Sequence, residues 1–77
     1  MECRERILID IGKLENSFKE IKDLNFSEKE KEIIERAKNY RDDCKYYLKK
    51  GDELTSFGCI TYSHGLIDAL KINHYLI

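Results

Sequence analysis

Apolar side chains recur at steps of three and four residues along much of the chain, and this spacing constrains the fold more than any other feature. The first apolar stripe consists of Ile7, Ile11, Leu14, Phe18 and Ile21. The second consists of Ile33, Ala37, Tyr40, Cys44 and Tyr47. Steps of this size place side chains on one face of an α-helix, so each stripe predicts an amphipathic helix that buries one side.

Two short segments predict where the helices begin and end. Ser27 followed by Glu30 is a capping box, in which two side chains satisfy unpaired backbone donors at a helix start. Gly51 is typical of a helix C-cap, and Asp52 is typical of the N-cap of the next helix. Because only these two residues separate the second helix from the third, the two should be antiparallel neighbours. The predicted fold is all-α, a three-helix up-and-down bundle in one domain of residues 1–77, with helices at about 3–23, 28–50 and 53–73.

The charge of the chain restricts its partners. Its 14 basic and 15 acidic side chains are interleaved and leave a net charge of -1, whereas phosphate recognition needs a basic surface. We therefore expect no nucleic-acid partner. No apolar stretch approaches the ~18 residues of a membrane span, and the charged residues 1–6 are unlike a signal peptide. These features favour a cytoplasmic protein with no membrane partner.

The three cysteines predict neither a metal site nor a disulfide. They contain no C-x-x-C pair, and their number is odd. Cys44 and Cys59 should lie near each other, but helix axes are ~8–10 Å apart, while a disulfide needs Cα atoms within about 7 Å. We therefore expect two neighbouring thiols, with no metal and no cofactor.

The third predicted helix differs from the other two because both of its faces lack charge. Its core face carries Phe57, Ile60, Ser63, Ile67 and Leu70, and its opposite face carries Gly58, Thr61, Tyr62, Gly65, Ala69 and Ile72. A helix with apolar or small residues on nearly every side is usually covered on more than one side. The small residues either pack closely against the first helix or form an interface with a second copy of the chain or another protein. Gly58, Tyr62, Gly65 and Ala69 are therefore candidate interface residues.

The short connections also predict which residues face each other. Across the Gly51 turn, the numbers of facing residues should sum to about 103, which brings Cys44 to Cys59 and Tyr40 to Ser63 and His64. Across the Ser27 turn they should sum to about 51, which brings Ile11 to Tyr40 and Phe18 to Ile33.

Four polar residues of the second and third helices are candidates for ligand binding: Tyr40, Asp43, His64 and Asp68. His64 and Asp68 are one helical turn apart and can pair, and Tyr40 could place its hydroxyl on the same imidazole or on Ser63. Such groups can build acid–base or nucleophilic sites. However, Ser63 and His64 point about 100° apart on one helix, which is poor geometry for a nucleophile and its base. We therefore assign no catalytic residue, and a hydrogen-bonded structural network remains the competing interpretation.

Residues 36–70 resemble a known family. The Gly51-Asp52 turn and the string YSHGLIDAL at residues 62–70 are similar to the core motif of a small archaeal family, domain of unknown function 357. The resemblance implies a three-helix bundle from an archaeon, with no assigned activity. It also implies that Tyr40, Asp43, Gly51, Asp52, His64, Gly65 and Asp68 occupy motif positions. Cys44 and Ser56 depart from the family pattern, which has a small residue such as Ala at both positions, and both departures concern packing rather than chemistry.

Two hypotheses for function remain. The first is a non-enzymatic interaction module that associates with itself or a protein partner through the small-residue face of the third helix. The alternative is a small-ligand, metal-binding or catalytic domain that uses the Tyr, Asp and His residues between the second and third helices. The length of the chain favours the first, because a single bundle of 77 residues has little room for a large concave pocket.

Overall fold

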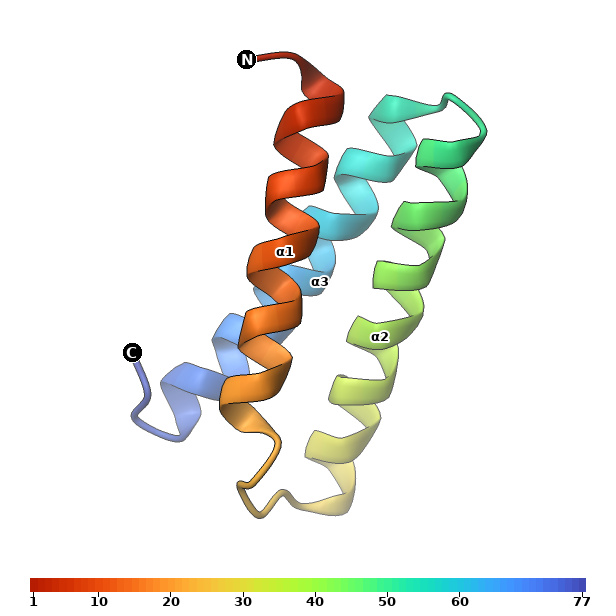
Figure 1. The fold of residues 1–77 in the computed structure, drawn as a ribbon. Helices are drawn as coiled ribbons and strands as arrows, with labels where there is room; N and C mark the ends of the chain where they lie inside the picture. The colour runs from red at the N-terminus through yellow and green to blue at the C-terminus, as the bar shows by residue number, and fades with distance from the viewer.

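The computed structural model describes all 77 residues and contains three α-helices. Helix α1 spans Cys3–Ile21, α2 spans Glu28–Lys49 and α3 spans Glu53–Asn73. The chain runs down α1, back up α2 and down α3 (Figure 1), which confirms the predicted all-α three-helix bundle. None of the three helices combines the length and the apolar character that crossing a membrane would require.

Local side-chain and backbone signals explain the ends of α2 and α3. The Ser27 hydroxyl accepts the Glu30 N–H at 3.2 Å, and the Glu30 carboxylate accepts the Ser27 N–H at 2.9 Å, as the capping box predicts. Gly51 follows α2 with φ of 83°, a left-handed conformation that favours glycine. The Asp52 carboxylate accepts the Thr55 N–H at 3.1 Å, and hydrogen bonding to Thr55 lowers the pKa of Asp52.

The core lies along the shared axis of the three helices. Its buried apolar members are Ile7, Leu14, Ile21, Ala37, Cys44, Leu48, Ile60, Ile67 and Leu70. Helix α3 packs against both other helices, whereas α1 and α2 have few contacts with each other. α3 is therefore the element that holds the bundle together.

The buried hydrogen bonds between α2 and α3 join residues whose numbers sum to 100 rather than the predicted 103 or so, whereas the contact between Tyr40 and Tyr62 lies close to the predicted pairing. The Ser63 hydroxyl donates to the Ala37 carbonyl at 2.7 Å, and the Ser56 hydroxyl donates to the Cys44 carbonyl at 2.8 Å. Ser63 therefore faces Ala37 rather than Tyr40. A buried hydroxyl must find an acceptor, and these two small side chains let α3 lie close enough to the backbone of α2 to use its carbonyls.

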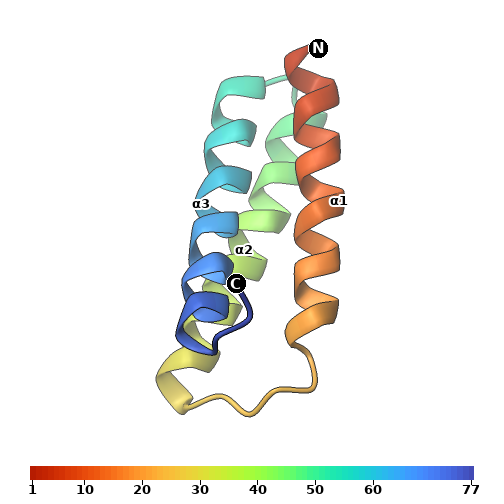
Figure 2. The same ribbon diagram turned by 90° about the vertical axis from the view of Figure 1, so that its left-hand side faces the viewer.

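The offset between α1 and α2 is larger still. Glu15 of α1 contacts Arg41 and Lys45 of α2, whereas the predicted pairing set Ile11 against Tyr40. The predicted register is wrong here by about two helical turns. Residues 22–27 run as an extended connection that places the start of α2 well beyond the end of α1 (Figure 2), so the connection behaves as a spacer rather than a tight turn.

A buried lysine joins α1 to α3. The side chain of Lys71 is 8% exposed, and its ammonium donates to the Ser17 hydroxyl at 3.1 Å and to the Glu20 carboxylate at 2.9 Å. A buried ammonium is tolerated only when it is paired and hydrogen-bonded. The spacing of apolar residues gives no indication that this side chain is inside.

Candidate functional site

The outward face of α3 is exposed and almost uncharged. It carries Leu54, Gly58, Thr61, Tyr62, Gly65, Ala69 and Ile72. Leu54 is 84% exposed and Ile72 is 61% exposed, and the nearest charged residue, Asp68, lies at the edge of these seven. We call these seven residues the α3 face. It is a helix side with apolar and small residues that no other element of the chain covers.

The two glycines of the α3 face are not required by the packing of the bundle. A Cβ atom added at Gly58 or Gly65 would have no atom within 4 Å among its potential neighbours. One of the two explanations offered for them is therefore wrong, because neither glycine lets α1 approach α3. Helix α1 instead packs on another side of α3, where it contacts His64 and Lys71.

Tyr40 lies at the border of the α3 face. Its ring packs at a tilt against the ring of Tyr62, with centroids 4.5 Å apart. The Tyr40 ring is half-buried, while Tyr62 is exposed. This contact holds Tyr62 in place and does not involve His64, to which the sequence had assigned the Tyr40 hydroxyl.

His64 is bonded to α1 rather than to its predicted partners. Its Nε2 lies 2.8 Å from the backbone carbonyl of Asp10, so Nε2 carries the proton and donates. The carboxylate of Asp10 accepts from Arg6 at 3.2 Å. His64 therefore links α1 to α3 and forms no hydrogen bond with Asp68 or Tyr40.

The structure places the four candidate ligand residues in two groups. His64 and Asp68 line a shallow depression of about 260 Å³ between α1 and α3, and Tyr40 and Asp43 lie on α2. No hydrogen bond joins any two of the four, and no group of three His, Cys, Asp or Glu side chains is placed to hold a metal ion. The depression is smaller than the ~300–1,000 Å³ of typical ligand pockets.

Cys44 and Cys59 are free thiols. The sulfur of Cys44 lies 3.3 Å from the Ser56 hydroxyl, so the two positions that depart from the family pattern contact each other. Burial raises the pKa of both Cys44 and Cys59. The protonated thiol is a poor nucleophile, which favours a packing role for both.

The family model described as "Protein of unknown function (DUF357)" matches residues 10–76. The chain belongs to this family. The match extends the resemblance at residues 36–70 into the first helix, so all three helices are part of the DUF357 unit. No match to the chain was found among curated proteins. The description of DUF357 carries no activity, and a function has to be argued from the geometry.

This DUF357 bundle also contains a groove between α1 and α2 that the sequence did not predict. The groove measures about 420 Å³ and is lined by Glu15, Phe18, Lys19, Ile21, Lys22, Phe26, Ile34 and Lys38. The predicted register had closed this space by packing Phe18 against Ile33. The length of the connection at residues 22–27 was the signal that the two helices could stand apart.

Glu30 ties the start of α2 to the end of α3 in the DUF357 fold. Its carboxylate lies 2.7 Å from Nε2 of His74 and accepts from the Asn73 amide at 3.3 Å, while it also caps the Ser27 N–H. The hydrogen bonds from the Ser27 backbone and from His74 lower the pKa of Glu30 to about 2. One carboxylate thus serves both a helix cap and a contact between helices.

This pKa predicts a loss of stability in acid. A carboxyl whose pKa falls from 4.5 to about 2 on folding stabilises the fold above pH 4.5, and the contribution is lost as the pH falls from about 4.5 through 2. In thermal unfolding followed by circular dichroism between pH 2 and 7, the Tm of wild type should therefore fall more steeply in this window than that of Glu30→Gln. Glu32→Gln alters an exposed carboxylate on the same helix and should follow wild type. Parallel curves for wild type and Glu30→Gln would contradict this role.

Proposed function

We propose that the chain is a non-enzymatic association module that pairs with a second copy of itself through the α3 face. The observation that carries the proposal is the position of Gly58 and Gly65, which lie in mid-helix, are exposed, and have open space where a Cβ would stand. A glycine inside a helix costs about 1 kcal/mol relative to alanine. Within the isolated bundle neither glycine allows a close contact that would offset this cost. The backbone of a second molecule, however, could approach α3 closely at both positions.

The order of side chains along the α3 face supports a second copy as the partner. Leu54 and Ile72 lie at the two ends of the face, and the large Tyr62 lies beside the small Gly65 near its centre. If two α3 helices pack antiparallel about a two-fold axis between residues 63 and 64, the large Tyr62 falls opposite the small Gly65, and two small residues face each other farther out. The facing pairs are Tyr62 with Gly65 and Gly58 with Ala69, and Leu54 lies within one residue of the position opposite Ile72. Such alternation of large and small residues gives close packing between helices.

The charge of the α3 face supports the same conclusion. None of its seven residues is charged and Asp68 lies at its edge, so the face offers little to a charged ligand and nothing to a phosphate backbone. Burial of apolar surface is the available driving force, and a two-fold interface uses the same patch on both copies.

Sedimentation velocity over a range of concentrations tests this proposal. Wild type should form dimers as the concentration rises, and Gly65→Glu should remain monomeric because it places a carboxylate at the centre of the interface. Gly12→Glu is the matched control: Gly12 is also an exposed mid-helix glycine with open space at its Cβ position, but it lies on α1. Circular dichroism should show both variants folded.

Two results would remove the proposal. One is a wild-type chain that stays monomeric up to millimolar concentration. The other is equal dissociation by Gly65→Glu and Gly12→Glu, which would mean that the effect comes from charge or helix propensity and not from the α3 face.

A further inference from the structure

The groove between α1 and α2 has an apolar floor. Phe18 and Ile21 contribute to it from α1, Ile34 from α2, and Phe26 from the connection between them. The groove exists because both helices pack on α3 and have few contacts with each other. In Figure 1 α1 crosses in front of α3 and α2 lies to one side of both, and none of the residues that line the groove belongs to α3.

Cationic side chains stand on both edges of this groove. Lys19 and Lys22 lie on the α1 edge and form no ion pair, and Lys38 lies on the α2 edge, 4.0 Å from Glu35. Arg41 and Lys45 extend the α2 edge at helical spacing. The Arg41 guanidinium also lies 5.2 Å from the centre of the Phe18 ring. The groove therefore combines an apolar floor with positive charge along its length.

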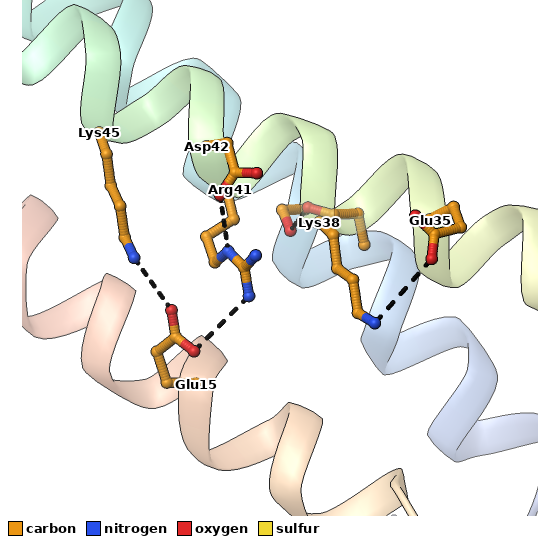
Figure 3. A network of polar contacts seen from close by, with 8 residues as sticks. Glu15, Glu35, Lys38, Arg41, Asp42 and Lys45 are labelled. Atoms are coloured by element: carbon orange, nitrogen blue, oxygen red, sulfur yellow. Dashed lines mark hydrogen bonds and ion pairs between the residues drawn. The ribbon is translucent and has the colours of Figure 1, made fainter.

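Glu15 demonstrates how these cations hold a carboxylate. It reaches across from α1, accepts a hydrogen bond from Lys45 at 3.3 Å and lies 3.6 Å from Arg41 (Figure 3). Glu15 and Asp42, whose carboxylate lies 3.1 Å from Arg41, thus occupy the cations at one end of the groove. The lysines at the other end, Lys19 and Lys22, have no such partner.

We propose that the α1–α2 groove binds an acidic amphipathic helix of a protein partner, which completes a four-helix arrangement. The bound helix places apolar side chains, spaced three and four residues apart, on the floor and carboxylates against the lysines on both edges. From Glu15 to Lys22 the groove extends for about 10 Å along α1, two helical turns, enough for three such anchors. Cations on both edges favour a partner with several carboxylates over an amphiphile with a single anionic head. This surface is separate from the α3 face, so it does not depend on self-association.

Two synthetic peptides of equal length test the proposal on the full chain. Both carry leucine at the same helical spacing, and one has glutamate at the flanking positions where the other has lysine. In a titration followed by nuclear magnetic resonance, the glutamate peptide should bind saturably and shift the signals of Phe18 and Ile34. The lysine peptide should bind at least tenfold more weakly.

Variants of the chain identify the groups responsible. The double change Lys22→Glu with Lys38→Glu should weaken binding of the glutamate peptide at least tenfold. The matched control, Lys29→Glu with Lys49→Glu, makes the same change of charge at exposed positions outside the groove and should leave binding unchanged. Glu15→Gln should strengthen binding several-fold, because it removes a competing carboxylate and releases Lys45, whose only ion pair is with Glu15, for the carboxylates of the peptide.

Several outcomes would overturn the proposal: equal binding of the two peptides, unchanged binding by the Lys22 and Lys38 double variant, or shifts confined to the α3 face. Decanoate serves as a second probe. If decanoate shifts Phe18 and Ile34 while the glutamate peptide does not, the groove is a site for a small amphiphile and the proposal is wrong. The salt dependence of wild-type binding provides a test that needs no variant, since affinity for the glutamate peptide should fall as ionic strength rises.

Discussion

Replacing Ile67 with alanine should destabilise the bundle by about 2–5 kcal/mol, the cost of removing a buried isoleucine and leaving a cavity. Ile67 is completely buried in the helix that packs on both others. At ~0.05–0.15 kcal/mol per residue, a chain of 77 residues has a free energy of unfolding of roughly 4–12 kcal/mol. The substitution should therefore remove a large part of the stability, which urea denaturation followed by circular dichroism will measure.

Ile72→Ala is the control for this change. The same side chain is removed from the same helix, but at a position on the exposed α3 face, so at low concentration the loss should stay within about 0.5 kcal/mol. If both variants lost a similar free energy of unfolding, Ile67 would not lie in the core while Ile72 lies on the surface, contrary to the structure.

Glu20→Gln should destabilise the fold, whereas Lys71→Met should not. Without the carboxylate charge of Glu20, the buried ammonium of Lys71 has only neutral partners, the Ser17 hydroxyl and the glutamine amide oxygen. Breaking a fully buried pair costs ~3–5 kcal/mol, and because Glu20 is itself 59% exposed, we expect a smaller loss of about 1–3 kcal/mol. Lys71→Met removes the charge and keeps the volume of the side chain, so its stability should lie within about 1 kcal/mol of wild type or above it.

Urea denaturation of both variants at neutral pH measures this contrast. Glu32→Gln, which removes an exposed carboxylate paired with a neighbouring lysine, provides the baseline for losing a surface ion pair. If Lys71→Met proved the more damaging of the two substitutions, the lysine would contribute to stability through its charge, contrary to this interpretation.

The fold could be predicted from local signals because local chemistry determines where helices end. The capping box at Ser27 and the left-handed turn at Gly51 depend on residues next to each other in the chain. The registers depend on tertiary contacts, and the prediction failed there. The buried hydroxyls of Ser56 and Ser63 bond to carbonyls of α2, a pairing that apolar periodicity does not encode.

The surfaces were predictable to different degrees for the same reason. The α3 face is a property of one helix, so the pattern of Gly58, Gly65 and Ala69 revealed it directly. The α1–α2 groove is a property of two helices and their offset, and no single stripe indicates it. His64 has a backbone carbonyl of Asp10 as its partner, and a backbone acceptor cannot be read from side-chain identities.

The unequal packing of the three helices also implies an order of assembly. α2 and α3 are joined by a connection of only three residues, 50–52, and pack against each other, so bringing them together costs little chain entropy. α1 is tethered by a longer connection and docks on the finished hairpin, mainly through α3. Undocking of α1 would therefore leave the α2–α3 hairpin behind. Because α1 is also one wall of the α1–α2 groove, the same undocking would remove the proposed binding site for a partner helix.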